Sequence, residues 1–261
     1  MTSASKIVIQ MNIKVGAAPW EVSKSHPYFN GRNLMYGAFS LSRGKDGFTL
    51  AFVGTINNEC TKVYSNIVMG IQKKEEIPVK VLDSLFMEWL KNYEATSKKM
   101  PEVIVLYREG LSDSQIKEQV SRSEVPALET LASKIRQKTN KIPEVVCVVI
   151  NKKINSRYFS IETHKQNQKF TSKISNPDSG SIILDSLSVD DSYDFHLAAQ
   201  KVTQGSCTPT LFKVAYDTSK MPQEALINFT FEQCFNYYNW EGAVRVPACL
   251  QSADKLSKLF G

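Results

Sequence analysis

The chain has 261 residues, of which 42% are hydrophobic and 22% are charged, and its formal net charge is +6 at pH 7. This length suits one large α/β domain, and the balance of apolar and charged residues is typical of a folded globular protein and not of a disordered one. No segment approaches the roughly 18 consecutive apolar residues of a membrane-spanning helix, so we expect no membrane partner.

Cysteine usage argues against both a zinc site and a disulfide framework. The five cysteines are odd in number and scattered, and none forms a CxxC pair. A reducing compartment, the cytoplasm or the nucleus, is therefore expected. The N-terminal residues contain no apolar signal region, and the chain begins like a domain excised from a longer protein.

The first third of the chain predicts a series of strands. Residues 7–15 alternate between apolar and polar, which is the pattern of a half-buried strand. Residues 34–41 and 48–56 predict two strands joined by a glycine-containing turn at 43–47, and residues 61–71 predict another. A meander of strands is the simplest interpretation.

The middle of the chain alternates helices with strands. Apolar residues at spacings of three and four predict a helix over 79–93, and another is predicted over 125–135. The continuous apolar runs 103–107 and 145–150 are typical of strands buried on both faces. Ser112 is placed to cap a short helix after the first of these strands.

The last third predicts three more strands and two helices. The strands lie around 182–184, 194–198 and 211–216, and the helices cover 222–237 and a short segment around 256–259. No repeat or linker divides the chain, so we expect one α/β domain with a central sheet over residues 1–261.

Basic residues gather in one segment, residues 151–175, where they are interleaved with aromatic residues and opposed by the single acid Glu162. The basic residues are Lys152, Lys153, Arg157, Lys165, Lys169 and Lys173, and the aromatic ones are Tyr158, Phe159 and Phe170. Two interpretations stay open: a solvated loop with a few aromatic anchors, or a surface that contacts nucleic acid.

Polar residues follow the two buried strands at the points where they end. Arg108-Glu109-Gly110 ends the first strand, and Lys152-Lys153 follows the second. Functional groups in open α/β sheets collect beyond the carboxyl ends of the central strands. A carboxylate beside a basic cluster suits contact with a phosphodiester, with or without metal-assisted hydrolysis, although Glu109 could also simply pair with a lysine.

Other reaction classes find little support. The three histidines form neither an HxH nor an HExxH spacing, and no GxSxG, Walker or GxGxxG motif is present. His196 lies in an apolar stretch, which favours a core histidine over a ligand or a base.

Four blocks of sequence resemble the PIWI domain of the Argonaute and Piwi proteins. They are IVIQMNIK at 7–14, MPEVIVLYREGLSDSQ at 100–115, VVINKKINSRYF at 148–159 and YYNWEGAVRVPACLQSADK at 237–255. Shorter matches at 193–197, 204–206 and 214–217 follow in the family's order. Gln10 and the YYNW block make the chain more similar to the Piwi branch.

The resemblance implies an RNase H-like α/β fold with a central mixed sheet flanked by helices. It implies a single PIWI domain over residues 1–261, without a PAZ domain and without most of a MID domain. Its partners would be a guide small RNA, a complementary RNA target and silencing proteins. Active members of the family cut the target with two divalent cations held by an Asp–Glu–Asp–Asp/His tetrad.

Carried over onto this chain, the tetrad is degenerate. Its first aspartate corresponds to Phe39, its glutamate to Glu76 with Glu75 as the alternative, its second aspartate to Glu109, and its last member to Asp254. A phenylalanine cannot bind a cation, and losing one ligand costs several kcal/mol of transition-state stabilisation. We therefore expect no slicing and no bound metal, with Glu109 and Asp254 as weak metal candidates.

The resemblance also implies contacts with the backbones of guide and target. Gln10 and Lys14 match positions near the guide's 5′ phosphate. The other matching positions are Arg245 and Gln251, near the 5′ end of the guide, and Lys152, Lys153 and Arg157, along the nucleic-acid channel. Such contacts recognise charge and helix shape and leave the reading of sequence to base pairing.

Two alternatives to a non-cleaving RNA-binding domain stay open. One is a residual endoribonuclease that uses the remaining acidic positions with Mg²⁺ or Mn²⁺, whereas RNA binding alone would need no cofactor. The other is a platform for tryptophan-containing peptides, built on the aromatic residues Phe229, Phe235 and Tyr238, for which core packing is the simpler explanation.

Overall fold

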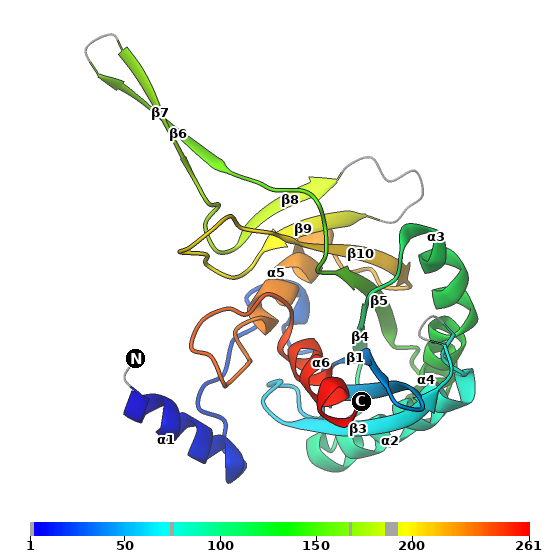
Figure 1. The fold of residues 1–261 in the computed structure, drawn as a ribbon. Coiled ribbons are helices and arrows are strands. Elements are labelled where there is room, and N and C mark those ends of the chain that lie inside the picture. Colours follow the sequence, from blue (N-terminus) through cyan, green and yellow to red (C-terminus); the bar gives the residue numbers. More distant parts are fainter. Residues whose placement is uncertain (1–2, 74–75, 167–168, 186–192) are drawn as a thin grey trace.

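The computed structural model describes residues 3–73, 76–166, 169–185 and 193–261, and its centre is an eight-stranded mixed sheet (Figure 1). The strand order is β3-β2-β1-β4-β5-β10-β9-β8. The strands are β1 (Leu34–Gly44), β2 (Gly47–Thr55), β3 (Val63–Ile71), β4 (Val103–Glu109), β5 (Glu144–Asn151), β8 (Ser181–Asp185), β9 (Asp194–Ala198) and β10 (Thr210–Asp217). Strands β1, β4 and β5 are parallel, and the other pairs are antiparallel.

Helices cover both faces of the sheet. One face carries α2 (Val79–Ser97) and α4 (Glu124–Thr139), and the other carries α5 (Gln223–Gln233) and α6 (Ala248–Phe260). Shorter elements are η1 (Pro27–Phe29), α3 (Asp113–Gln115) and the π-helical turn η2 (Ile116–Val120). Each face holds its own apolar core. None of the helices in the described part of the chain is long and apolar enough to cross a membrane.

The apolar periodicity of the sequence accounts for this arrangement. β4 and β5 are buried on both faces because helices cover both sides of the sheet. In α2 the side chains at spacings of three and four are buried, among them Trp89, whose Nε1 donates to the Thr55 carbonyl at 2.8 Å. A Cβ on Gly54 would lie 2.4 Å from that nitrogen, so this close approach of helix and strand requires glycine.

Two predicted elements differ from the structure. Residues Ser3–Lys14 form the helix α1, not a strand, and none of them is buried. Ile7 and Met11, which suggested an alternating strand, are also four residues apart and so share a helical face. Helix α5 ends at Gln233 and does not reach Tyr237. The other predicted helices and strands are confirmed, including the cap at Ser112, whose backbone N–H donates to the Gln115 side chain.

A buried ion pair joins the end of β4 to the start of α4. Nη1 of Arg108 lies 2.6 Å from Oε1 of Glu124, and the two side chains are 1% and 0% exposed. Burial raises the pKa of Glu124 to about 7, although the positive charge of Arg108 acts to lower it. Desolvation therefore outweighs the attraction between the partners, as is common for buried pairs.

We predict that replacing Glu124 by glutamine changes how stability depends on pH. Because the folded pKa of Glu124 lies above its usual value of 4.5, this group stabilises the native state most below pH 4.5 and loses that contribution as the pH rises towards 7. The unfolding free energy of the wild type minus that of Glu124→Gln should fall by about 3 kcal/mol over this range.

Urea denaturation between pH 4.5 and 8 measures this difference. A difference that rises with pH would contradict the assignment. Arg108→Met serves as the companion variant and should lose on the order of 3–5 kcal/mol, because it leaves a buried carboxylate without its partner.

Candidate functional site

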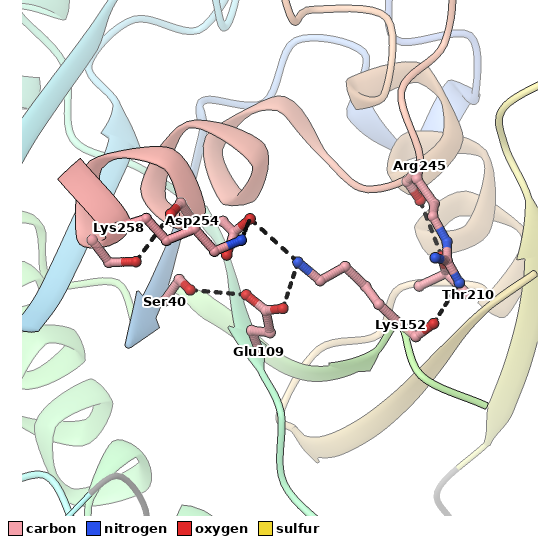
Figure 2. A network of polar contacts seen from close by, with 8 residues as sticks. Ser40, Glu109, Lys152, Thr210, Arg245, Asp254 and Lys258 are labelled. Carbon is pink, nitrogen blue, oxygen red and sulfur yellow. Dashed lines mark hydrogen bonds and ion pairs between the residues drawn. The ribbon is translucent and has the colours of Figure 1, made fainter. Parts of the chain in front are cut away.

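Polar side chains from four elements meet at the carboxyl ends of the parallel strands (Figure 2). The Nζ atom of Lys152 lies 2.5 Å from Oε1 of Glu109 and 3.6 Å from Oδ2 of Asp254. Ser40 donates to the other oxygen of Glu109 at 2.8 Å, and Nζ of Lys258 lies 2.8 Å from Oδ2 of Asp254. We call these five residues the strand-end network.

The topology brings these residues together. Ser40 lies on β1, Glu109 ends β4 and Lys152 directly follows β5, so three parallel neighbours deliver their side chains to one edge of the sheet. Asp254 comes from α6, which packs on β1 and β2. Lys258 follows Asp254 by one helical turn, which places both side chains on one side of that helix.

The strand-end network is partly buried and its formal charges cancel. The side chains of Glu109, Lys152 and Asp254 are 19%, 22% and 14% exposed, so their attraction is screened less than that of surface pairs. Lys258 is mostly exposed, and its hydrogen bond to Asp254 raises the pKa of its ammonium group. Two carboxylates and two ammonium groups make the formal sum zero.

Phe39, the position matched to the first aspartate of the tetrad, does not belong to this network, so this residue does not support the prediction of no slicing. Its ring is 0% exposed and packs in the core under α2 and α4. Phe39 pairs with Arg108 across β1 and β4, and the guanidinium carbon lies 5.8 Å from the ring centre. Successive strand residues point to opposite faces, so Ser40 occupies the position beside Glu109.

The expected glutamate of the tetrad is not part of the network either. Glu76 lies in the connection between β3 and α2, is 53% exposed and pairs with Lys73 at 3.0 Å. The alternative, Glu75, lies outside the residues that the structure describes. Of the four positions carried over from the family, the structure brings together Glu109 and Asp254.

Arg245, which was expected to contact a guide backbone, donates hydrogen bonds to main-chain carbonyls of this chain. Its guanidinium donates to the carbonyl of Lys152, and the hydroxyl of Thr210 donates to the carbonyl of Arg245 (Figure 2). The guanidinium also donates to the Pro209 carbonyl at 3.3 Å. Burial lowers the pKa of Arg245. Arg245 therefore positions the residue whose ammonium group completes the network. Gln251 lies half-buried on α6.

The basic segment is a β-hairpin, not a loop. Strands β6 (Ser160–Gln166) and β7 (Lys169–Ser175) pair with each other and extend away from the main sheet (Figure 1). Lys153, Arg157 and Lys173 are exposed along its base and stem. The side chains of Lys165, Lys169 and Phe170 lie outside the part of the structure that is described.

Gln10 and Lys14 are exposed on α1, apart from the strand-end network. The neighbouring residue Ile13 lines a cavity of about 500 Å³ together with Tyr237 and Asn239. Gln10 and Lys14, which were predicted to contact phosphate from the polar face of a strand, are thus exposed on a helix instead.

Of the aromatic residues considered for peptide binding, Phe229 lies in the core, whereas Phe235 and Tyr238 are half-buried. Phe229 is fully buried and contacts Phe29, and the ring of Phe235 packs edge-on against Phe231. The hydroxyl of Tyr238 donates to the main chain of Trp20 at 3.1 Å.

Ser40 and Lys258 were not predicted from the sequence as members of the site. Each had a signal: Ser40 lies on the opposite face of its strand from Phe39, and Lys258 follows Asp254 at helical spacing. Neither signal has meaning until the register of β1 against β4 and the position of α6 are known.

The strand-end network does not fit the paired divalent cations that the resemblance implies. On β1 the side chain beside Glu109 is the neutral hydroxyl of Ser40, and the ammonium group of Lys152 lies between the two carboxylates. Among the residues that the structure describes, no group of three or more His, Cys, Asp or Glu could hold a metal ion. Hard cations of this kind prefer several negatively charged oxygens.

We predict opposite consequences for the two neighbouring positions on β1. Phe39→Ala should lower the unfolding free energy by about 3–5 kcal/mol, because it opens a cavity in the core. Ser40→Ala should cost only about 1 kcal/mol, the value of one hydrogen bond. Urea denaturation measures both, with the half-exposed Phe159→Ala as the control near zero. A smaller loss for Phe39→Ala than for Ser40→Ala would reverse the assigned faces.

Comparison with known proteins identifies the family of this chain. The family model described as "Piwi domain" matches residues 1–261. Piwi-like protein Ago3 of Bombyx mori is 31% identical over 256 residues, which cover 98% of this chain and 26% of that protein. Protein argonaute-3 of Drosophila melanogaster is 32% identical over 256 residues, covering 98% and 27%. The chain thus spans about a quarter of the length of these relatives.

Solved structures show the same fold. The crystal structure of Drosophila Piwi has a TM-score of 0.79 at 28% identity and covers 99% of this chain and 33% of that one. Kluyveromyces polysporus Argonaute with a guide RNA has a TM-score of 0.81 at 21% identity, covering 97% and 30%. The chain therefore belongs to the Piwi domain family and has its RNase H-like fold.

Proposed function

We propose that this chain is the guide- and target-binding domain of a small-RNA silencing protein and that it does not cut its target. Membership of the Piwi domain family supports the first part, as does the similar fold of an Argonaute solved with a guide RNA. The strand-end network carries the second part, because a lysine ammonium group lies between its carboxylates.

Electrostatics make the network a poor place for metal-assisted hydrolysis. That chemistry needs cations that activate water and stabilise the leaving oxygen. A divalent ion held by Glu109 and Asp254 would lie close to the Lys152 ammonium group. At about 4 Å and an effective dielectric constant of about 20, the repulsion is roughly 4 kcal/mol for each unit of charge on the ion. Ser40 supplies no compensating charge.

The hairpin and its base supply the charge for binding RNA. Lys153, Arg157 and Lys173 are exposed, whereas Lys152 is engaged in the strand-end network. Cationic side chains along an extended element recognise the phosphate backbone without reading its sequence. The proposed partners are a guide RNA, an RNA target and silencing proteins, and binding needs no cofactor.

A cytoplasmic or nuclear location completes the proposal. All five cysteines are buried and free, and burial raises the pKa of each thiol. Free thiols in such number suit a reducing compartment.

The proposal predicts that the chain, loaded with a 5′-phosphorylated guide RNA, leaves a complementary target intact in Mg²⁺ and in Mn²⁺. Denaturing gel electrophoresis of end-labelled target measures this. A slicing-competent Piwi protein run in parallel is the positive control. Guide-directed cuts that disappear in Glu109→Ala would contradict the proposal and establish the residual endoribonuclease instead.

A second prediction concerns RNA affinity. Replacing Lys153, Arg157 and Lys173 together by glutamine should weaken binding at every sequence tested. It should also reduce the slope of log affinity against log salt by about 2, because each contact with a single strand contributes roughly 0.7. Fluorescence anisotropy over a salt series measures the slope.

The matched control removes the same number of positive charges from the two helices α2 and α4, away from the hairpin. Lys80 and Lys91 on α2 and Lys134 on α4 are exposed, and glutamine at these three positions should leave the slope unchanged. Equal effects of the two triple variants would show that net charge alone, and not the hairpin, drives binding.

A further inference from the structure

We infer that Lys152 is a built-in cation, whose ammonium group replaces a divalent ion between Glu109 and Asp254 and lets the domain bind RNA without magnesium or manganese. The inference rests on the proposed function for its RNA ligand. It is supported by the distances of the strand-end network, in which an ammonium group and a hydroxyl, and not further carboxylates, lie beside Glu109.

Lys152 takes the central place in the network. Its Nζ atom contacts a carboxylate from β4 and a carboxylate from α6, so one ammonium group bridges two elements as a bound cation would (Figure 2). An ammonium group has three N–H donors. Within the described part of the chain, Glu109 lies within hydrogen-bond distance of the ammonium group, whereas Asp254 at 3.6 Å attracts it by charge alone, so N–H donors remain for a phosphate oxygen.

The lysine is held in place from both ends. Arg245 fixes its main-chain carbonyl, while Glu109 and Asp254 fix its ammonium group. The backbone N–H of Gly110 donates to the carbonyl of Ile150 at 3.0 Å, which ties the end of β4 to the end of β5. A side chain restrained in this way loses little further entropy when RNA binds.

The charge balance explains why such a cation is needed. Two partly buried carboxylates at the strand ends would repel an RNA phosphate unless a cation neutralised them. Lys152 and Lys258 provide two positive charges against the two of Glu109 and Asp254. The edge of the sheet is thus neutral without any ion from solution, and RNA can lie across it.

Direct measurement of Mn²⁺ binding tests the inference independently of RNA. Titration of the full chain with MnCl₂, followed by the electron paramagnetic resonance of free Mn²⁺, should give no saturable site for the wild type. Lys152→Met should gain a saturable Mn²⁺ site, at least about ten-fold tighter than any residual binding to the wild type, because its carboxylates lose their counter-charge. Lys152→Arg keeps the charge and should behave as the wild type does.

Controls separate the local charge from the fold. Lys134→Met removes the charge of an exposed lysine on α4 and should gain no Mn²⁺ site. Circular dichroism and thermal melting verify that each variant is folded, and Lys152→Gln is the second neutral variant should methionine unfold the chain. Folded neutral variants that bind Mn²⁺ no more tightly than the wild type would overturn the inference.

RNA binding supplies the second readout. The wild-type affinity for a 5′-phosphorylated RNA should stay within about two-fold when EDTA replaces Mg²⁺ at constant ionic strength, whereas Lys152→Met should become dependent on Mg²⁺. Loss of wild-type binding in EDTA would refute the built-in cation. No RNA binding under any condition would refute the proposed function instead, and the Mn²⁺ titration would still decide whether Lys152 replaces a metal.

Discussion

The alternation of side chains along β1 and β4 determines what each face of the sheet contains. Arg108 and Glu109 are neighbours in sequence, yet one is buried against Glu124 under α4 and the other joins Lys152 at the opposite face. The same alternation separates Phe39 from Ser40. The register of these strands therefore directs Arg108 into the interior and the next residue, Glu109, into the candidate site.

Much of the fold and the location of the site follow from the sequence, because both depend on local patterns. The apolar runs of β4 and β5 have the length and composition of central strands, and polar residues at their ends had to gather at one edge. Residues 7–15 were wrongly predicted because their alternation also places Ile7 and Met11 on one helical face. Whether such a segment becomes a strand depends on a neighbouring strand, which its own sequence does not specify.

The details of the site lie beyond local patterns. Ser40, and not Phe39, is the neighbour of Glu109, and this could be recognised only from the register between β1 and β4. A shift of one residue would exchange the two faces. Arg245 is distant in sequence from the Lys152 carbonyl that it holds, and no periodicity connects them. Its match to a guide-contacting position did not indicate that two main-chain carbonyls hold its guanidinium.

Binding and cleavage place different demands on this sheet edge. Recognition of an RNA backbone needs positive charge distributed along an extended surface, and it tolerates changes in the position of any one lysine. Paired-cation hydrolysis needs several anionic oxygens at fixed places around each ion. Here a hydroxyl and an ammonium group stand among the carboxylates, so the edge is neutral towards a phosphate backbone but does not offer the ligands that paired cations need. A scaffold that keeps its strand ends but lacks the anionic ligands around them can thus lose the chemistry without losing the surface that binds RNA.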